Sequence, residues 1–223
     1  MRLIASADGR RRIWYRADEI EQLCASTLFS AGLIPRPPRC DVDIETLVET
    51  HLGAEVDYGA STPTDVLGYT EFRDVPLIAV SRSLTDAATA SNAGLGAVGR
   101  WRATIAHEAA HVLLHSALYS AASMQPGQPN TRPIRCPRAT FESPTSSRDW
   151  REVQANMGMA SLLMPRELFD REAAEAFSRR GPVMPPVRAR EPWLDIVVAV
   201  LASRFKVSKL AARIRLEVMG YID

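Results

Sequence analysis

Apolar and polar residues recur along the chain with two different periods, and these periods predict its secondary structure. In residues 17–31 the apolar side chains have helical spacing, which predicts an amphipathic helix. A second helix is predicted to begin with Asp41 or Asp43 as its N-cap and to end near Leu52. Residues 1–12 show neither period, and we interpret them as a frayed, basic lead-in.

Three short stretches alternate apolar and polar residues, as half-buried strands do. They are residues 54–58, 66–72 and 75–80. Arg73-Asp74, between the last two stretches, is a hairpin signal. Residues 81–100 are polar and contain three glycines, so we interpret them as a flexible approach to the helix that follows. Arg100 and Arg102 are expected at the surface.

The second half of the chain has helical stretches separated by prolines. Two helices are predicted at about residues 103–115 and 150–164, and the proline-rich residues 121–149 join them. A connection of this length is either functional, as a wall of a substrate cleft, or disordered. Three further helices are predicted at residues 166–179, 193–205 and 208–219.

The last two predicted helices resemble a helix-turn-helix pair. Val207-Ser208 would form the turn, with Ser208 as a favourable N-cap. Four basic residues between Lys206 and Arg215 supply positive charge, but DNA reading requires an exposed basic face. We therefore prefer the interpretation that this pair packs on the rest of the chain, with DNA binding as the alternative.

The composition is that of an ordinary globular protein. Hydrophobic residues make up 46% and charged residues 24%, and the net charge of +1 gives no reason to expect attraction to nucleic acid or membranes. Cys24, Cys40 and Cys136 have no metal-ligand spacing and fit reduced thiols. No stretch approaches about 18 unbroken apolar residues, so we expect a cytoplasmic protein without a membrane span.

The candidate chemistry lies in His107-Glu108-Ala-Ala-His111. In a helix, His107 and His111 lie one turn apart on one face, where two imidazoles can share a tetrahedral Zn²⁺. Glu108 is rotated away from that pair, so it can reach a metal-bound water without occupying a coordination position. The five-residue pattern also occurs by chance, and two packed or solvated histidines are an equal interpretation until a third ligand is found.

Two residues are candidates for the third ligand. His115 repeats the spacing, but it lies about 12 Å along a straight helix from His107, whereas Zn–N bonds are about 2.1 Å. We therefore expect His115 to be packed, solvent-facing or supporting a ligand. Glu152 can project toward the metal from the second helix, and Asn156, one turn later, can orient a ligand side chain. From spacing alone, an exposed acid at a helix start is the simpler interpretation of Glu152.

The two segments together resemble the ImmA/IrrE-type zinc metallopeptidases. That family joins His-Glu-x-x-His to a later helix of the form Glu-x-(Glu/Gln)-Ala-Asn-x-Phe-Ala-x-x-Leu-Leu-Met-Pro. Residues 107–115 and 152–165 match these patterns, and the resemblance extends from roughly Val42 to the C-terminus. Gly158 replaces the phenylalanine and Met159 the alanine after it, which indicates local repacking or room for another chain.

The resemblance implies a set of site residues and a fold. Three residues would bind zinc and one would be the catalytic acid/base, namely His107, His111 and Glu152 for the metal and Glu108 for catalysis. The implied fold class is α+β: a mainly helical zincin-like domain with a small antiparallel sheet beside the His-Glu-x-x-His helix. We expect residues 1–165 to form this core, and residues 166–223 to form a C-terminal helical segment packed on it.

The resemblance also implies an activity and a partner. It indicates a zinc-dependent endopeptidase that cleaves a helix-turn-helix transcriptional repressor and so releases gene expression, for example under stress. The alternative is a DNA-binding or protein-interaction module with a structural zinc site, which would need no acid such as Glu108 beside its ligands. A second donor for the substrate carbonyl is expected, and the candidates are Tyr69, Asn92, Tyr119 and Arg148.

Overall fold

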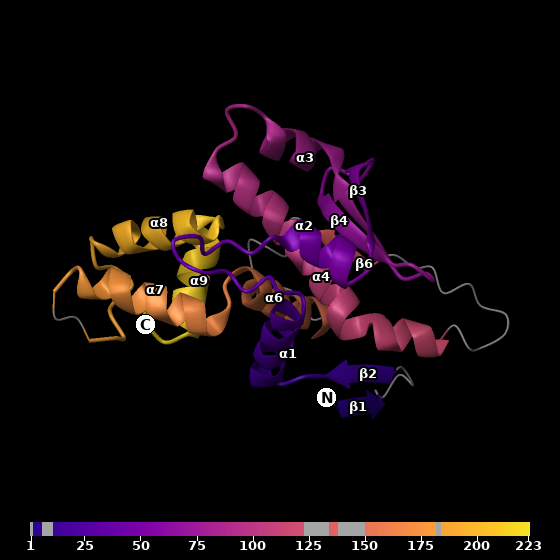
Figure 1. Cartoon of the computed structure of the whole chain (residues 1–223), viewed down its shortest axis with the longest axis horizontal. Coiled ribbons are helices and arrows are strands. Elements are labelled where there is room, and N and C mark those ends of the chain that lie inside the picture. Colours follow the sequence, from indigo (N-terminus) through magenta and orange to yellow (C-terminus); the bar gives the residue numbers. More distant parts are fainter. Residues whose placement is uncertain (1, 6–10, 123–133, 138–149, 182–183) are drawn as a thin grey trace.

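A computed structural model shows a mainly helical protein with two small sheets (Figure 1). The structure describes residues 2–5, 11–122, 134–137, 150–181 and 184–223. The predicted α+β class with mostly helices is confirmed. Most of the proline-rich segment expected to be either a cleft wall or disordered lies outside the described residues.

The chain begins with an antiparallel pair of strands, β1 (Arg2–Ala5) and β2 (Arg11–Trp14). The prediction of a frayed lead-in is therefore wrong here. Four-residue strands are too short to show a clear alternation, and their pairing depends on a partner that local periodicity does not reveal. Helix α1 (Ala17–Ser30) follows as predicted, and its buried face includes Ile20, Cys24 and Leu28.

A short helical segment comes next, comprising α2 (Ile44–Thr46) and the π-helix η1 (Leu47–His51). The side chain of Asp43 accepts a hydrogen bond from the Thr46 backbone N–H at 3.0 Å. Of the two predicted N-caps, Asp43 is therefore the one that the structure uses. The segment ends before Gly53, whose φ of +61° suits glycine.

The larger sheet has the strand order β3-β5-β4-β6, with β3 (Glu55–Ala60), β4 (Val66–Glu71), β5 (Leu77–Ser81) and β6 (Ile134–Pro137). The predicted hairpin is confirmed as the antiparallel pair β4 and β5, and β6 is antiparallel to β4. However, β3 joins the far edge of the hairpin and runs parallel to β5. The sheet is therefore mixed, and the expectation of an antiparallel sheet is wrong. The reason is that β3 pairs with β5, which runs in the same direction, and not with its neighbour in sequence, β4.

The segment predicted to be a flexible approach is instead mostly helical. Helix α3 (Arg82–Thr89) is followed by the long helix α4 (Leu95–Ala122), which begins well before the His-Glu-x-x-His motif. Arg100 is exposed as expected, but Arg102 is buried, and its guanidinium donates to the Val42 carbonyl oxygen at 2.7 Å. The surface prediction for Arg102 is wrong because α4 runs through the protein interior there.

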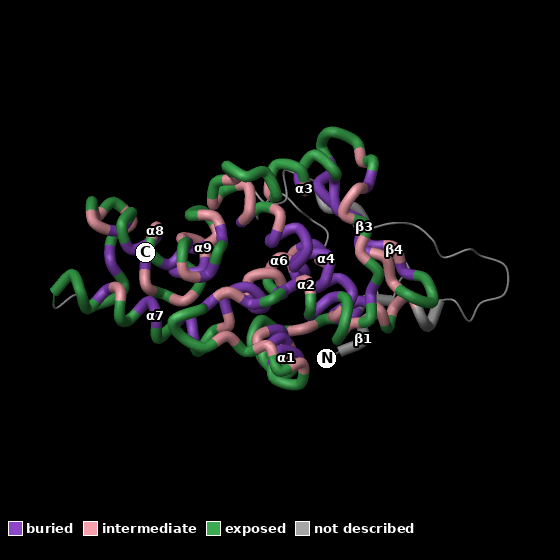
Figure 2. The backbone as a smooth tube through the Cα atoms, turned by 45° about the horizontal axis from the view of Figure 1, so that its top comes forward, coloured by how far each residue is buried: buried purple, intermediate pink, exposed green. Residues whose placement is uncertain are grey.

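In the described residues after β6, the helices are α6 (Trp150–Leu163), α7 (Arg166–Ser178), α8 (Leu194–Phe205) and α9 (Lys209–Val218). Helix α6 packs against α4 and α1, and α7, α8 and α9 lie together at the end of the molecule away from the larger sheet (Figure 1). The buried stretches of the chain concentrate along α4 and α6 (Figure 2). These two helices are therefore the centre of the protein.

The turn between α8 and α9 is held against α4. Ser208 caps α9 as predicted, accepting from the Ala211 N–H at 3.1 Å, and Val207 is buried. A Cβ atom at Gly99 of α4 would lie 2.7 Å from the Ser208 backbone nitrogen, so only glycine permits this close approach. The packing of the helical pair is thus visible, while the division of the chain at residue 165 stays a prediction.

Within the described part of the chain, no helix has the length and apolar character needed to cross a membrane.

Candidate metal centre

Helix α4 carries both histidines of the motif into the interior. Alanine favours helix more than any other residue, and small buried alanines on α4 let neighbouring elements pack close to its backbone. His107, Glu108, His111 and His115 are each 0% exposed. The interpretation of the two motif histidines as solvated is therefore wrong, and their burial requires hydrogen-bond or metal partners.

Helix α6 brings the third residue of the site. At the crossing of the two helices, a Cβ atom on Gly158 would lie 2.7 Å from the Ala110 Cβ of α4. Gly158, which departs from the family pattern, therefore permits the close approach of α6 to α4. Six residues earlier on α6, or about 1.7 turns, Glu152 is 7% exposed and points toward α4. It is not the exposed helix-start acid that spacing alone suggested.

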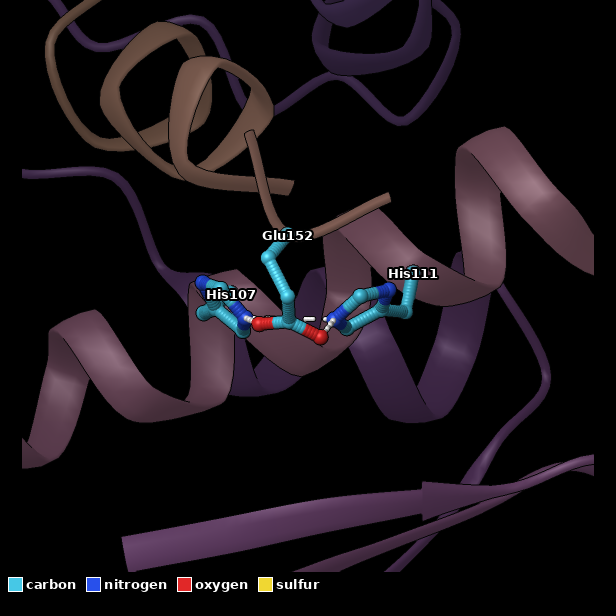
Figure 3. A group of neighbouring side chains, drawn as sticks. All are labelled: His107, His111 and Glu152. Atoms are coloured by element: carbon cyan, nitrogen blue, oxygen red, sulfur yellow. Dashed lines mark hydrogen bonds and ion pairs between the residues drawn. The ribbon is translucent and has the colours of Figure 1, made fainter. Parts of the chain in front are cut away.

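The carboxylate of Glu152 lies between the two imidazoles (Figure 3). Its Oε2 is 3.1 Å from His107 Nε2, and its Oε1 is 3.4 Å from His111 Nε2. The two Nε2 atoms are themselves 3.1 Å apart. Within the described residues, these three side chains form a buried group that can hold a metal ion.

For each imidazole, the hydrogen bond made by the ring nitrogen that faces away from the group indicates which nitrogen carries the proton. The Nδ1–H of His107 donates to Asn156 Oδ1 at 3.1 Å, because a carbonyl oxygen can only accept. In the same way, the Nε2–H of His115 donates to Gln154 Oε1 at 3.2 Å. The Nδ1 of a neutral His115 is then an acceptor, and His111 Nδ1–H donates to it at 3.1 Å. Neutral His107 and His111 therefore both present a lone pair on Nε2.

The ionisation of the buried groups agrees with this assignment. Burial lowers the pKa of His111 to about 4 and that of His115 to about 3, so both rings are neutral near pH 7. Burial raises the pKa of the Glu152 carboxyl, but its contacts with His107 and His111 lower it by more, and the net pKa is below its ordinary value. Glu152 is therefore an anion beside the neutral His111 ring, as a metal site requires.

The donor set fits zinc. Two nitrogen lone pairs and an ionised carboxylate that face one another at 3.1 to 3.4 Å repel unless a cation lies among them. Bonds of about 2.0–2.1 Å to a tetrahedral Zn²⁺ separate neighbouring ligand atoms by about 3.4 Å. Two imidazole nitrogens with one carboxylate oxygen are also a known zinc ligand set that leaves the fourth position open.

Glu108 lies on another side of α4 from this group. Its Oε2 accepts a hydrogen bond of 2.6 Å from the hydroxyl of Thr70, on β4, and both side chains are fully buried. The carboxylate is thus held at the contact between α4 and the larger sheet. Glu108 is next to His107 in sequence, but its hydrogen-bond partner Thr70 comes from β4, a strand that contributes none of the three candidate ligands.

The supporting residues were only partly predictable. Asn156, which the sequence suggested could orient a ligand, is hydrogen-bonded to His107, and His115 is hydrogen-bonded to His111 without joining the group. Gln154 was not singled out, although its place in the second motif was a usable signal. Thr70 was missed because nothing in a strand pattern relates it to a motif 38 residues away.

Three of the four residues expected as candidates for the second donor to a substrate carbonyl lie in the described part of the chain. Tyr119 stacks on Phe72 with ring centroids 4.0 Å apart, and its hydroxyl accepts from Arg151 at 2.9 Å. Asn92 is exposed and Tyr69 is half-buried, while Arg148 lies outside the described residues. Cys24 and Cys40 are buried free thiols, and the side chain of Cys136 also lies outside the described part.

Comparison with known proteins connects this site to a family. The model of a peptidase family, described as the IrrE N-terminal-like domain, matches residues 97–217, which is more than half of the 223-residue chain. The matched range contains both motif segments and runs from α4 into α9. A comparison with curated proteins finds no match.

Proposed function

The chain belongs to the peptidase family of the IrrE N-terminal-like domain, and from this premise we propose that it is a zinc-dependent endopeptidase. The observation that carries the proposal is the convergence of two imidazoles and one carboxylate in the interior, together with a buried acid one residue after His107. A structural zinc site has no use for such an acid. A hydrolytic site needs a proton carrier next to its ligands.

The ligand residues have distinct tasks. His107 and His111 would hold Zn²⁺ through their Nε2 atoms, and Glu152 would complete the set through a carboxylate oxygen. When bound, zinc supplies Lewis acidity that polarises the scissile carbonyl and lowers the pKa of bound water. Asn156 and His115 keep the two rings in the tautomer that binds metal, because each accepts the outer N–H.

Glu108 would move the proton. As a buried carboxylate, it takes a proton from the attacking water and passes it to the leaving amine. Its position one residue after His107 keeps it near the ligands while its side chain leaves their face of the helix. One acid then serves both halves of peptide-bond hydrolysis.

The substrate we propose is a helix-turn-helix transcriptional repressor, whose cleavage would release gene expression in the cytoplasm. The proposal rests on the resemblance to ImmA/IrrE-type peptidases, which often act on a repressor encoded beside them. The alternative of direct DNA binding is less well supported. Of the four basic residues that motivated it, three are paired with acids of the same chain, in the contacts Lys206–Asp41, Arg213–Asp195 and Arg215–Glu21.

The test is cleavage of a repressor encoded next to the gene, with zinc per chain measured on the same samples. We expect the wild type to hold about one zinc per chain and to cut the repressor, and Glu108→Gln to keep the metal while losing at least about 100-fold in rate. Glu152→Gln should lose both metal and activity, because it removes a charged ligand.

The matched control is Glu167→Gln, which neutralises an exposed acid at the start of α7. It should keep both zinc and cleavage. Equal zinc occupancy in Glu152→Gln and wild type would remove Glu152 from the site. Equal cleavage by Glu108→Gln and wild type would remove Glu108 from the reaction.

A further inference from the structure

The contact between Thr70 and Glu108 joins the sheet to the proposed proton carrier. The Thr70 hydroxyl lies 2.6 Å from Glu108 Oε2, and both residues are 0% exposed. A hydroxyl that donates to an ionised carboxylate makes one of the stronger hydrogen bonds in proteins, and 2.6 Å is a typical length for it. We infer that Thr70 is a positioning residue that fixes the Glu108 carboxylate for proton transfer.

The local structure of β4 is built for this contact. Gly68 and Thr70 are two residues apart in the strand, so they face the same side of the sheet, toward α4. A Cβ atom at Gly68 would lie 2.7 Å from the Thr104 side chain and 2.9 Å from the Ala79 carbonyl oxygen. Gly68 therefore lets β4 approach α4 closely enough for the short Thr70 side chain to reach Glu108.

Positioning matters here because Glu108 must give and take a proton within one turnover. A glutamate side chain has three rotatable bonds, and proton transfer needs the carboxylate within about 3 Å of the reacting atom. Displacing a reacting group by about 1 Å can cost about 100-fold in rate. A buried hydrogen bond from a β-branched side chain on a sheet strand restricts Glu108 without placing a second acid beside it.

The inference deepens the proposed function, on which it rests, and kinetics can test it separately. The variants are Thr70→Val, which keeps the shape and removes the donor, and Thr70→Ser, which keeps the donor. Thr104→Val is the matched control. Thr104 is also fully buried at the contact of α4 with β4, but its hydroxyl donates to the Arg100 carbonyl oxygen of its own helix.

We expect Thr70→Val to lower kcat about 10- to 100-fold, with KM within about twofold, on a quenched peptide that spans the repressor cleavage site. Thr70→Ser and Thr104→Val should stay within about threefold of the wild type. Zinc per chain should be the same in all four proteins, because the hydrogen bonds of the Thr70 hydroxyl go to Glu108, which is not a candidate ligand. Wild-type kcat in Thr70→Val, or an equal loss in Thr70→Ser, would overturn the positioning role while leaving the proposed function standing.

A second measurement does not depend on cleavage. The Tm lost on Thr70→Val should be larger in the wild-type background than in Glu108→Gln, since a hydrogen bond to a carboxylate is about twice as strong as one to a neutral amide. Equal losses in the two backgrounds would overturn the inference. If the wild type binds zinc but cuts no repressor, the proposed function fails, and the catalytic role of Thr70 fails with it.

Discussion

At the scale of single residues, the outer nitrogen of each imidazole decides whether the inner nitrogen can bind a metal. His107 gives its outer proton to an amide oxygen of α6, and His111 gives its own to His115. His115 can accept only because Gln154 takes its remaining proton. The third histidine of the helix, His115, therefore accepts the hydrogen bond of His111, although it lies too far along α4 to share a metal ion with His107. Such partners of ligands commonly set metal affinity as strongly as geometry does.

This hydrogen-bond network leads to a prediction for the zinc affinity of a His115 variant. In His115→Phe the ring packed edge-on against Trp150 is kept, but the acceptor for His111 Nδ1–H is lost. We expect zinc to bind about 10- to 100-fold more weakly, because His111 is no longer held in the tautomer that binds metal. Competition with a chromophoric chelator measures this. The control is His51→Phe, because His51 is exposed on η1, and this variant should bind zinc like the wild type. An unchanged Kd for zinc in His115→Phe would contradict the proposed hydrogen bond from His111 to His115.

At the scale of elements, α4 approaches three of its neighbours closely at a glycine. Gly68 permits the close approach of β4 to α4, and Gly158 permits that of α6. Gly99, which is in α4 itself, permits the close approach of the turn between α8 and α9. At each of the three places an added Cβ atom would lie 2.7 Å from its nearest neighbour, which is closer than atoms can pack. The site depends on two of these contacts, those at Gly68 and Gly158, because its residues come from α4, β4 and α6.

The α4–α6 contact yields a stability prediction. Gly158→Ala should lower the free energy of unfolding by about 1–3 kcal/mol, because the clash with Ala110 outweighs the better helix propensity of alanine. Urea unfolding of the metal-free protein measures it, and adding Ala110→Gly should recover part of the loss. Gly96→Ala is the control, since a Cβ atom there has nothing within 4 Å, and it should gain up to about 1 kcal/mol. Equal stability of Gly158→Ala and the control would show that the helices can separate without cost.

At the scale of the whole molecule, ion pairs connect the C-terminal helices to the N-terminal part. Arg215 of α9 is 3% exposed and pairs with Glu21 of α1, and its guanidinium also donates to the Met164 carbonyl oxygen at 2.9 Å. Arg215 thus joins α9 to α1 and to the end of the helix that carries Glu152. Arg215, one of the basic residues of the helix-turn-helix-like pair, therefore contributes to the packing of the C-terminal helices on the rest of the chain.

Removing Arg215 should therefore destabilise the whole protein. We expect Arg215→Ala to cost about 3–5 kcal/mol in urea unfolding, because Glu21 and a main-chain oxygen lose a buried partner. Arg213→Ala is the control. It breaks a pair with Asp195, whose side chain is 82% exposed, and should cost about 1 kcal/mol or less. Similar losses in the two variants would mean that the Arg215 pair adds no more than a surface contact.

The sequence by itself determined the parts of the site that lie within one or two helical turns. The spacing of His107 and His111 placed both imidazoles on one face, and the same geometry kept Glu108 off that face and His115 too far from His107 to share a metal ion with it. Helical periodicity predicted most of the helices and alternation predicted the hairpin, because the backbone repeats of helix and strand are local. Glu152 could be assigned only by resemblance to a family, since its spacing also fitted an exposed acid at a helix start.

Only the tertiary structure decided which distant residues meet. Glu152 reaches His107 across 45 positions, and Thr70 reaches Glu108 across 38. The parallel pairing of β3 with β5 and the burial of Arg102 were likewise not apparent in the pattern. The first two contacts also depend on how closely α6 and β4 can approach α4, which Gly158 and Gly68 permit. Local periodicity shows which face of an element is apolar, but not which neighbour covers that face.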